Sequence, residues 1–223
     1  MEHAIKHGPV FSTLHVTLNT GETVIGEKGA MISMTPSVEL KAKTAGKGIF
    51  GAAKAMIGGE ALFSTTFTAQ ENNSEVVLAP SSPGDIIHFS LNGQKILAQG
   101  GTYLAGTEGL ELGTQGSLRG ALMGEGLFLQ TISGTGDVWL SSYGAVYVKE
   151  LGEGEEYSVD NGNMVAFESS VSFTIKKATK GLFSTFASGE GFVSRFKGPG
   201  KVWIQTRSIT GLAALLMPYM QKK

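Results

Sequence analysis

Short runs in which apolar and polar residues alternate predict β-strands along most of the chain. Residues 14–19 and 87–92 place apolar side chains at every second position, with His, Thr or Ser between them. This period of two is typical of a strand that buries one face. Residues rich in Asn and Gly follow each run, as in a β-hairpin. A third strand-like run, residues 146–151, stands at the corresponding place in the last third of the chain, but its alternation is one residue out of phase, as at a β-bulge. The pattern indicates an all-β protein.

One motif, a Gly-Glu pair followed by apolar residues, occurs three times at a spacing of roughly 65 residues. The three copies are Gly59 with Glu60, Gly124 with Glu125, and Gly189 with Glu190. Strand-like runs recur with the motif, whereas the segments between them differ in length, as in repeats whose insertions lie in loops. We therefore predict three tandem units, at residues 10–80, 83–143 and 144–207. A unit of this size buries only about 60% of its unfolded surface, so the units are expected to form one body.

The last strand predicted in each unit has a bulky residue at the same place. Trp139 and Trp203 occupy this place in the second and third units, and Val77 occupies it in the first. Equivalent bulky positions are most simply explained by core packing. A turn is predicted before each of these strands, at residues 70–75, 133–137 and 197–201, because these segments are rich in turn-forming residues.

Residues 208–221 depart from the strand pattern and predict a short helix. Their apolar residues follow helical spacing from Ile209 to Met220. Ser208 or Thr210 can cap the first turn, and Pro218 is expected to end or kink the helix. We expect its apolar side chains to pack on the chain's own strands or on another subunit.

Composition supports a folded protein and excludes several kinds of chemistry. Glycine makes up 32 of the 223 residues, about twice its usual share of roughly 7%, but 41% of the chain is apolar and only 17% is charged. The glycines are therefore expected in turns between folded strands. There is no cysteine, which excludes disulfides and thiol nucleophiles. The formal net charge of −1 gives no overall attraction to nucleic acid or anionic lipid.

The first residues lack both the apolar core of a signal peptide and the basic amphipathic pattern of a transit sequence. No window contains the roughly 18 consecutive apolar residues of a membrane span. From the sequence we expect a cytoplasmic protein.

The chain resembles the bacterial branch of the mitochondrial-biogenesis (altered inheritance of mitochondria) family. The resemblance rests on the three Gly-Glu hairpins, the segment at residues 29–34, and residues 206–212 after the strand at residues 201–205. Members of that family resemble the tryptophan RNA-binding attenuation protein (TRAP) in fold. The resemblance implies three tandem short double-stranded β-helix subdomains and a homo-oligomer, most simply a trimer. It implies no catalytic residue, metal or cofactor.

Two short patterns suggest chemistry but fit structural roles better. Residues 46–51 match G-x-G-x-x-G, yet the dinucleotide fingerprint requires a βαβ unit and the surroundings are hairpins. Of the four histidines, His15 and His88 stand at matching places on the polar faces of two strands, so only His3 and His7 are expected to lie together. A metal or acid–base site would need two histidines to converge with a carboxylate.

Two accounts fit Glu60, Glu125 and Glu190. In one, the three carboxylates gather at a shared axis and form a site for an oxygen-ligated cation. In the other, each carboxylate accepts hydrogen bonds from backbone N–H groups of its own turn. We favour the second account because it needs only local geometry.

We expect a non-enzymatic, homo-oligomeric scaffold or assembly protein. The alternative is a small-ligand or RNA-binding regulator resembling TRAP, which would show a basic groove or an enclosed apolar pocket. The basic residues that could serve RNA fall in the third unit only, namely Lys176, Lys177, Lys180, Arg195, Lys197 and Lys201. An enzyme would need a convergent polar cluster in a cleft, which the spacing of the histidines and carboxylates does not indicate.

Overall fold

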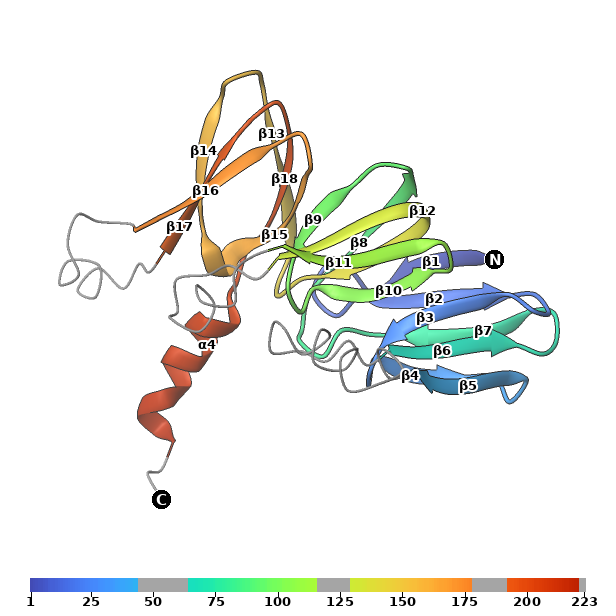
Figure 1. The fold of residues 1–223 in the computed structure, drawn as a ribbon. Helices are drawn as coiled ribbons and strands as arrows, with labels where there is room; N and C mark the ends of the chain where they lie inside the picture. Colours follow the sequence, from blue (N-terminus) through green and yellow to red (C-terminus); the bar gives the residue numbers. More distant parts are fainter. Residues whose placement is uncertain (44–63, 116–128, 178–191, 221–223) are drawn as a thin grey trace, which may run out of the picture.

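The computed structural model describes residues 1–43, 64–115, 129–177 and 192–220 (Figure 1). These residues form β-strands throughout, with one α-helix near the C-terminus. The prediction of an all-β fold with a short terminal helix is therefore confirmed. The three Gly-Glu pairs (Gly59 with Glu60, Gly124 with Glu125, Gly189 with Glu190) and the glycine pattern at residues 46–51 lie outside the described residues.

The strands fall into three consecutive groups, which we call the first, second and third strand sets. Strand β1 (Glu2–Lys6) precedes them. The first set comprises β2 (Thr13–Leu18), β3 (Thr23–Glu27), β4 (Met31–Met34), β5 (Val38–Lys43), β6 (Ser64–Ala69) and β7 (Ser74–Leu78). The second comprises β8 (Ile86–Asn92), β9 (Ile96–Gln99), β10 (Tyr103–Thr107), β11 (Leu110–Gln115) and β12 (Leu129–Ser141). The third comprises β13 (Val146–Leu151), β14 (Glu156–Asp160), β15 (Met164–Glu168), β16 (Ser172–Lys177), β17 (Phe192–Lys197) and β18 (Gly200–Gln205), with the 3₁₀ turn η1 (Asn161–Asn163) before β15.

All three sets use the same antiparallel pairings. In the first set, β7 lies between β2 and β4, and β6 lies between β3 and β5. In the third set, β18 lies between β13 and β15, and β17 lies between β14 and β16. In the second set, one long strand does both: the last half of β12 pairs with β8 and β10, and its first half pairs with β9 and β11. Each strand therefore has an equivalent in the other two sets.

The sets are joined to one another by strand pairing and by a shared core. Strand β3 pairs with β10 of the second set, and β9 pairs with β15 of the third set. Isolated parallel bridges also link Phe11 to Gly84 and Gly84 to Gly144, just before the first strand of each set. Leu104 of β10 lies in the core cluster of the first set, and Val165 of β15 lies in that of the second. The connections thus bury apolar surface that a set alone would expose.

Two strands lack on one side the pairing that their equivalents have. Within the described residues, β4 pairs only with β7, and β14 pairs only with β17. They belong to different sheets and lie at opposite ends of the molecule, β14 in the orange part and β4 in the blue part (Figure 1).

The turn predicted at residues 133–137 is wrong. These residues lie inside β12, which runs without interruption from Leu129 to Ser141. Gly134 and Gly136 have φ values of +103° and +146°, which side-chain-bearing residues rarely adopt, so the glycines bend the strand instead of reversing it. Pairing with β11 on one side of the bend and with β8 on the other holds both halves extended.

Helix α4 (Ile209–Leu216) and the 3₁₀ turn η2 (Met217–Tyr219) form the C-terminal segment and project away from the sheets (Figure 1). The Ser208 hydroxyl accepts a hydrogen bond from the Gly211 N–H at 3.1 Å, and Pro218 lies in η2, as predicted. None of the helical residues is buried, and Leu215 is 65% exposed. The alternative in which this helix packs on the described strands is therefore wrong.

Candidate functional site

A cluster of aromatic and titratable side chains lies where the first and second strand sets meet. His3 is on β1, His88 is on β8, and Asp137 and Trp139 are on β12. Because β8 and β12 are antiparallel with His88 opposite Trp139, the imidazole stacks on the indole at a centroid distance of 5.4 Å. Strand β1 brings His3 to 4.3 Å from the His88 ring and 5.1 Å from the Trp139 ring. We call these four residues the histidine–tryptophan cluster.

The polar contact within this cluster joins His88 to Asp137, whose Nε2 and Oδ1 atoms are 2.8 Å apart. His3 and His7, which the sequence predicted as neighbours, do not come together: His7 instead faces His15, with 6.5 Å between ring centroids. No group of three or more His, Asp or Glu side chains that could hold a metal ion occurs within the described ranges. The cluster therefore brings two histidines beside a carboxylate without forming a metal site among the described residues.

Burial lowers the pKa of the His3 imidazole below its ordinary value of 6.5, and the neighbouring His88 lowers the pKa further, while Asp137 opposes both effects. We call β1 docked when it is paired with β2 and His3 lies against His88 and Trp139. Because the pKa of His3 is lower in this docked state, docking favours release of a proton from the imidazole. Docking of β1 is therefore strongest above about pH 6.5 and weakens as the pH falls through the lowered pKa of His3.

We expect the backbone amides of β1 to be less protected from hydrogen exchange at roughly pH 5 than at pH 8, after correction for the intrinsic rates. His3→Phe keeps an aromatic ring against His88 and Trp139 but cannot titrate, so it should remove this difference. Strand β16 serves as the internal control. An unchanged pH dependence in His3→Phe would show that another group controls the docking.

The described residues also line surface hollows, one of which includes His88 of this cluster. One of about 480 Å³ extends from His88 and Phe89 to Lys95, Glu168 and Trp203. One of about 370 Å³ lies beside β14, between Tyr147, Tyr157, Val159 and Ile204. A third of about 190 Å³ has mainly small polar residues around it, including Ser141, Ser142 and Thr210. The hollow beside β14 combines several apolar side chains with a strand edge that has no partner within the described residues.

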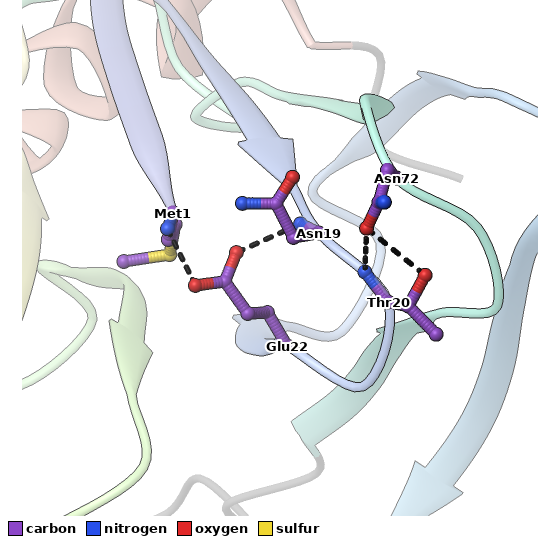
Figure 2. Close-up of polar contacts among 5 residues, drawn as sticks. All are labelled: Met1, Asn19, Thr20, Glu22 and Asn72. Atoms are coloured by element: carbon purple, nitrogen blue, oxygen red, sulfur yellow. Dashed lines mark hydrogen bonds and ion pairs between the residues drawn. The ribbon is translucent and has the colours of Figure 1, made fainter.

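The first hairpin turn shows how a glutamate can stabilise backbone geometry. Figure 2 shows the Glu22 carboxylate between the Asn19 backbone N–H, at 2.7 Å, and the Met1 ammonium group, at 2.5 Å. Thr20 at the tip of the turn donates to the Asn72 side chain from its N–H and its hydroxyl. The hydrogen bond from Asn19 and the ion pair hold the pKa of the Glu22 carboxyl below its usual range.

The corresponding turns of the other two sets have the same kind of contact. The Gln94 side chain accepts from the Asn92 N–H at 2.5 Å, and Glu155 accepts from the Gly152 N–H at 3.0 Å. This is the local role that the sequence analysis assigned to Glu60, Glu125 and Glu190, found here at other residues. The signal that sequence analysis missed is an acidic or amide side chain two or three positions after the first turn residue.

Carboxylates lie beside some of the basic residues of the third set. Arg195 donates to the Glu156 carboxylate at 3.4 Å across the β14–β17 pair. Lys149 on β13 pairs with Glu155 at 2.7 Å. Lys180 lies outside the described residues. Neighbouring carboxylates thus offset part of the charge that RNA binding would require.

Comparisons with known proteins agree along nearly the whole chain. The family model described as Mitochondrial biogenesis AIM24 matches residues 3–207. An uncharacterised protein of Streptococcus pyogenes serotype M6 is 27% identical over 229 residues, which span 99% of this chain and 91% of that protein. A crystal structure of a Streptococcus pyogenes protein is 26% identical with a TM-score of 0.82, covering 98% of this chain and 99% of that one. In the part of the chain that the structure describes, no helix is long and apolar enough to cross a membrane.

Proposed function

Because the chain belongs to the Mitochondrial biogenesis AIM24 family, we propose that it is a non-enzymatic assembly protein that acts as a homo-oligomer. The supporting observation is the exposure of large apolar side chains on the C-terminal segment. Tyr219 is 82% exposed, and the other members of this surface are Ile209, Leu215, Leu216, Met217 and Met220. An apolar surface of this kind marks a contact with another protein molecule or subunit. A second copy covers it without requiring any other component.

The internal architecture that we propose is three tandem TRAP-like subdomains at residues 10–80, 83–143 and 144–207, followed by the helix at 208–221. The pairing pattern common to the three strand sets supports this division. We propose three copies in the assembly, the stoichiometry that the family resemblance implies, and a cytoplasmic location.

Native mass spectrometry of the purified chain tests the proposal, since it reports subunit number and any retained ligand together. We expect a homo-oligomer with nothing bound. A monomer at every concentration would overturn the proposal, and retained RNA or a small molecule would favour the regulator instead.

A double substitution tests the role of the helix in the same measurement. Leu215→Ser with Leu216→Ser removes two large apolar side chains that are exposed in the single chain. We expect the assembly to weaken by at least about tenfold, since each fully buried leucine contributes about 1.5–3 kcal/mol. Thr210→Ala on the same helix is the matched control and should leave assembly unchanged. Equal assembly of both variants would exclude the helix from the interface.

A further inference from the structure

We propose that copies of this chain join head to tail by antiparallel pairing of strand β14 in one copy with strand β4 in the next. The proposal rests on the homo-oligomer proposed above and specifies how its copies meet. It follows from the two unpaired edges, the contacts that their equivalents make within the chain, and the exposure of the residues beside them.

The chain already contains this contact twice. In each case the second strand of one set pairs with the third strand of the next set: β3 with β10, and β9 with β15. In the first contact Gly26 lies opposite Ala105, and in the second Ala98 lies opposite Ala166. Gly26 is equivalent to Ala98, and Ala105 is equivalent to Ala166, so the two contacts have the same register.

Strands β4 and β14 are the third strand of the first set and the second strand of the last set. In a row of three sets, the third strand of the first set and the second strand of the last set each have one edge without a partner among the described residues. Strands of these two kinds pair with each other elsewhere in the chain, so the two edges can form the same contact. Because they lie at opposite ends of the molecule (Figure 1), a second copy can supply the missing strand. Each copy then offers one β4 edge and one β14 edge.

The register of the new pair follows from the pairings inside the sets. Met34, Gly106 and Phe167 are equivalent, because each lies opposite the same valine position of its set, namely Val76, Val138 and Val202. The residues directly before them, Ser33, Ala105 and Ala166, are therefore equivalent as well. On the other edge, Tyr157, Val24 and Ile96 are equivalent, because they lie opposite the equivalent residues Phe196, Phe67 and Ile132. Two residues further along each strand, Val159, Gly26 and Ala98 are therefore equivalent. Val159 is therefore placed opposite Ser33 of the partner subunit, and Ser158 opposite Met34 of the partner subunit.

The burial of equivalent residues supports the same contact. Leu104 and Val165 precede Ala105 and Ala166 and are both 0% exposed, because each lies in the core cluster of the preceding set. Ile32, their equivalent on β4, is 56% exposed. Ile32 thus stands where its equivalents are buried, but among the described residues of the single chain there is no preceding set whose core could cover it.

The edge of β14 provides a place for this side chain. The hollow of about 370 Å³ beside it has the aromatic and aliphatic side chains of Tyr147, Tyr157, Val159 and Ile204 around it, together with polar residues that include Asp160, Asn163 and Gln205. Tyr147 and Ile204 are directly opposite each other on β13 and β18, as Leu14 and Leu78 are on β2 and β7. Leu14 and Leu78 belong to the cluster that receives Leu104. Ile32 of the partner subunit is therefore expected to enter this hollow.

This contact is heterologous, because it uses different surfaces on the two copies. Repeated from copy to copy, it generates a closed ring or an open filament, according to the rotation that relates neighbours. It also covers two strand edges that would otherwise be free to pair with other chains.

Disulfide cross-linking tests the register directly, since the chain has no cysteine of its own. Residues directly opposite in an antiparallel pair have Cα atoms about 4.5–5.5 Å apart, within the range that a disulfide spans. Ser158→Cys and Met34→Cys are prepared as separate proteins, checked for folding by circular dichroism, mixed and oxidised. We expect a cross-linked dimer from the mixture and none from either protein alone, because the contact is head to tail. Ser158→Cys mixed with Ser33→Cys is the register control and should cross-link at least about tenfold less, because neighbouring side chains point to opposite faces.

A second test keeps the proposal falsifiable if a cysteine variant fails to fold. Ile32→Glu should convert the oligomer to monomers in native mass spectrometry while circular dichroism still shows a folded chain, since Ile32 is exposed in the single chain. Ile5→Glu, at an exposed position on β1, is the matched control and should retain the oligomer.

The outcomes separate the two proposals. An oligomer that survives Ile32→Glu, together with no disulfide between the Ser158→Cys and Met34→Cys proteins, would overturn the edge pairing and leave the homo-oligomer standing. A wild-type monomer would overturn both.

Discussion

Replacement of Trp139 by alanine is expected to lower the free energy of unfolding by about 3–5 kcal/mol, the cost of removing a large aromatic side chain from a packed core. Trp139 is fully buried, belongs to the core cluster of the first strand set, and contacts the rings of His3 and His88. Its loss therefore opens a cavity where β1, β8 and β12 meet. Urea unfolding followed by circular dichroism measures the change as a lower midpoint.

Trp203 offers a matched control, because it occupies the equivalent position on β18 and is only partly buried. It packs edge-on against Phe89 at a centroid distance of 4.8 Å. We expect Trp203→Ala to cost at least about 1 kcal/mol less than Trp139→Ala, since less apolar surface is lost from the core. Equal losses would show that the core at Trp139 relaxes around the cavity.

Substitution of Gly84 by alanine is expected to destabilise the fold by about 3 kcal/mol, at the upper end of the usual cost of overpacking. A Cβ atom at this position would lie 1.7 Å from the Ser142 carbonyl oxygen, so backbone must move. The movement affects the point where the three sets are joined, since Gly84 bridges Phe11 and Gly144 and accepts a hydrogen bond from the Ser12 N–H at 3.0 Å. Thermal and urea unfolding should both show the loss.

Gly152→Ala is the control for Gly84→Ala. A Cβ atom at Gly152 would meet only the Glu155 carboxylate, at an ordinary contact distance of 3.7 Å. We expect a change within about 0.5 kcal/mol, as for most surface substitutions. If the two alanine variants unfold alike, the close approach at Gly84 does not limit stability.

The elements that sequence analysis predicted well are those specified by neighbouring residues. The strand at residues 146–151 has the bounds that alternation predicted, and the helix after Ser208 begins at the predicted cap. The family was likewise predicted from the recurring hairpin motifs and is confirmed. Side-chain period, turn residues and capping are local properties, so a single sequence contains them.

Neither the continuity of β12 through residues 133–137 nor the histidine–tryptophan cluster could be predicted from the sequence, because both depend on tertiary contacts. The glycines at residues 133–137 favour a turn locally, but strands pairing on both sides keep β12 extended. His3 lies against His88 because β1 folds back on β2 beside β8, and residues so distant in sequence have no local signal for this contact.

The sequence by itself determined the β-strand pattern, the terminal helix and the family, because each depends on residues close together in the chain or on motifs that recur along it. The tertiary structure decided which strand edges are paired. Strand β4 (Met31–Met34) is apolar in character, like its equivalents β10 (Tyr103–Thr107) and β15 (Met164–Glu168). A preceding set covers β10 and β15, whereas no preceding set in the described part of the chain covers β4. Whether a strand edge is covered depends on the position of its set in the row, which the residues of the strand do not encode.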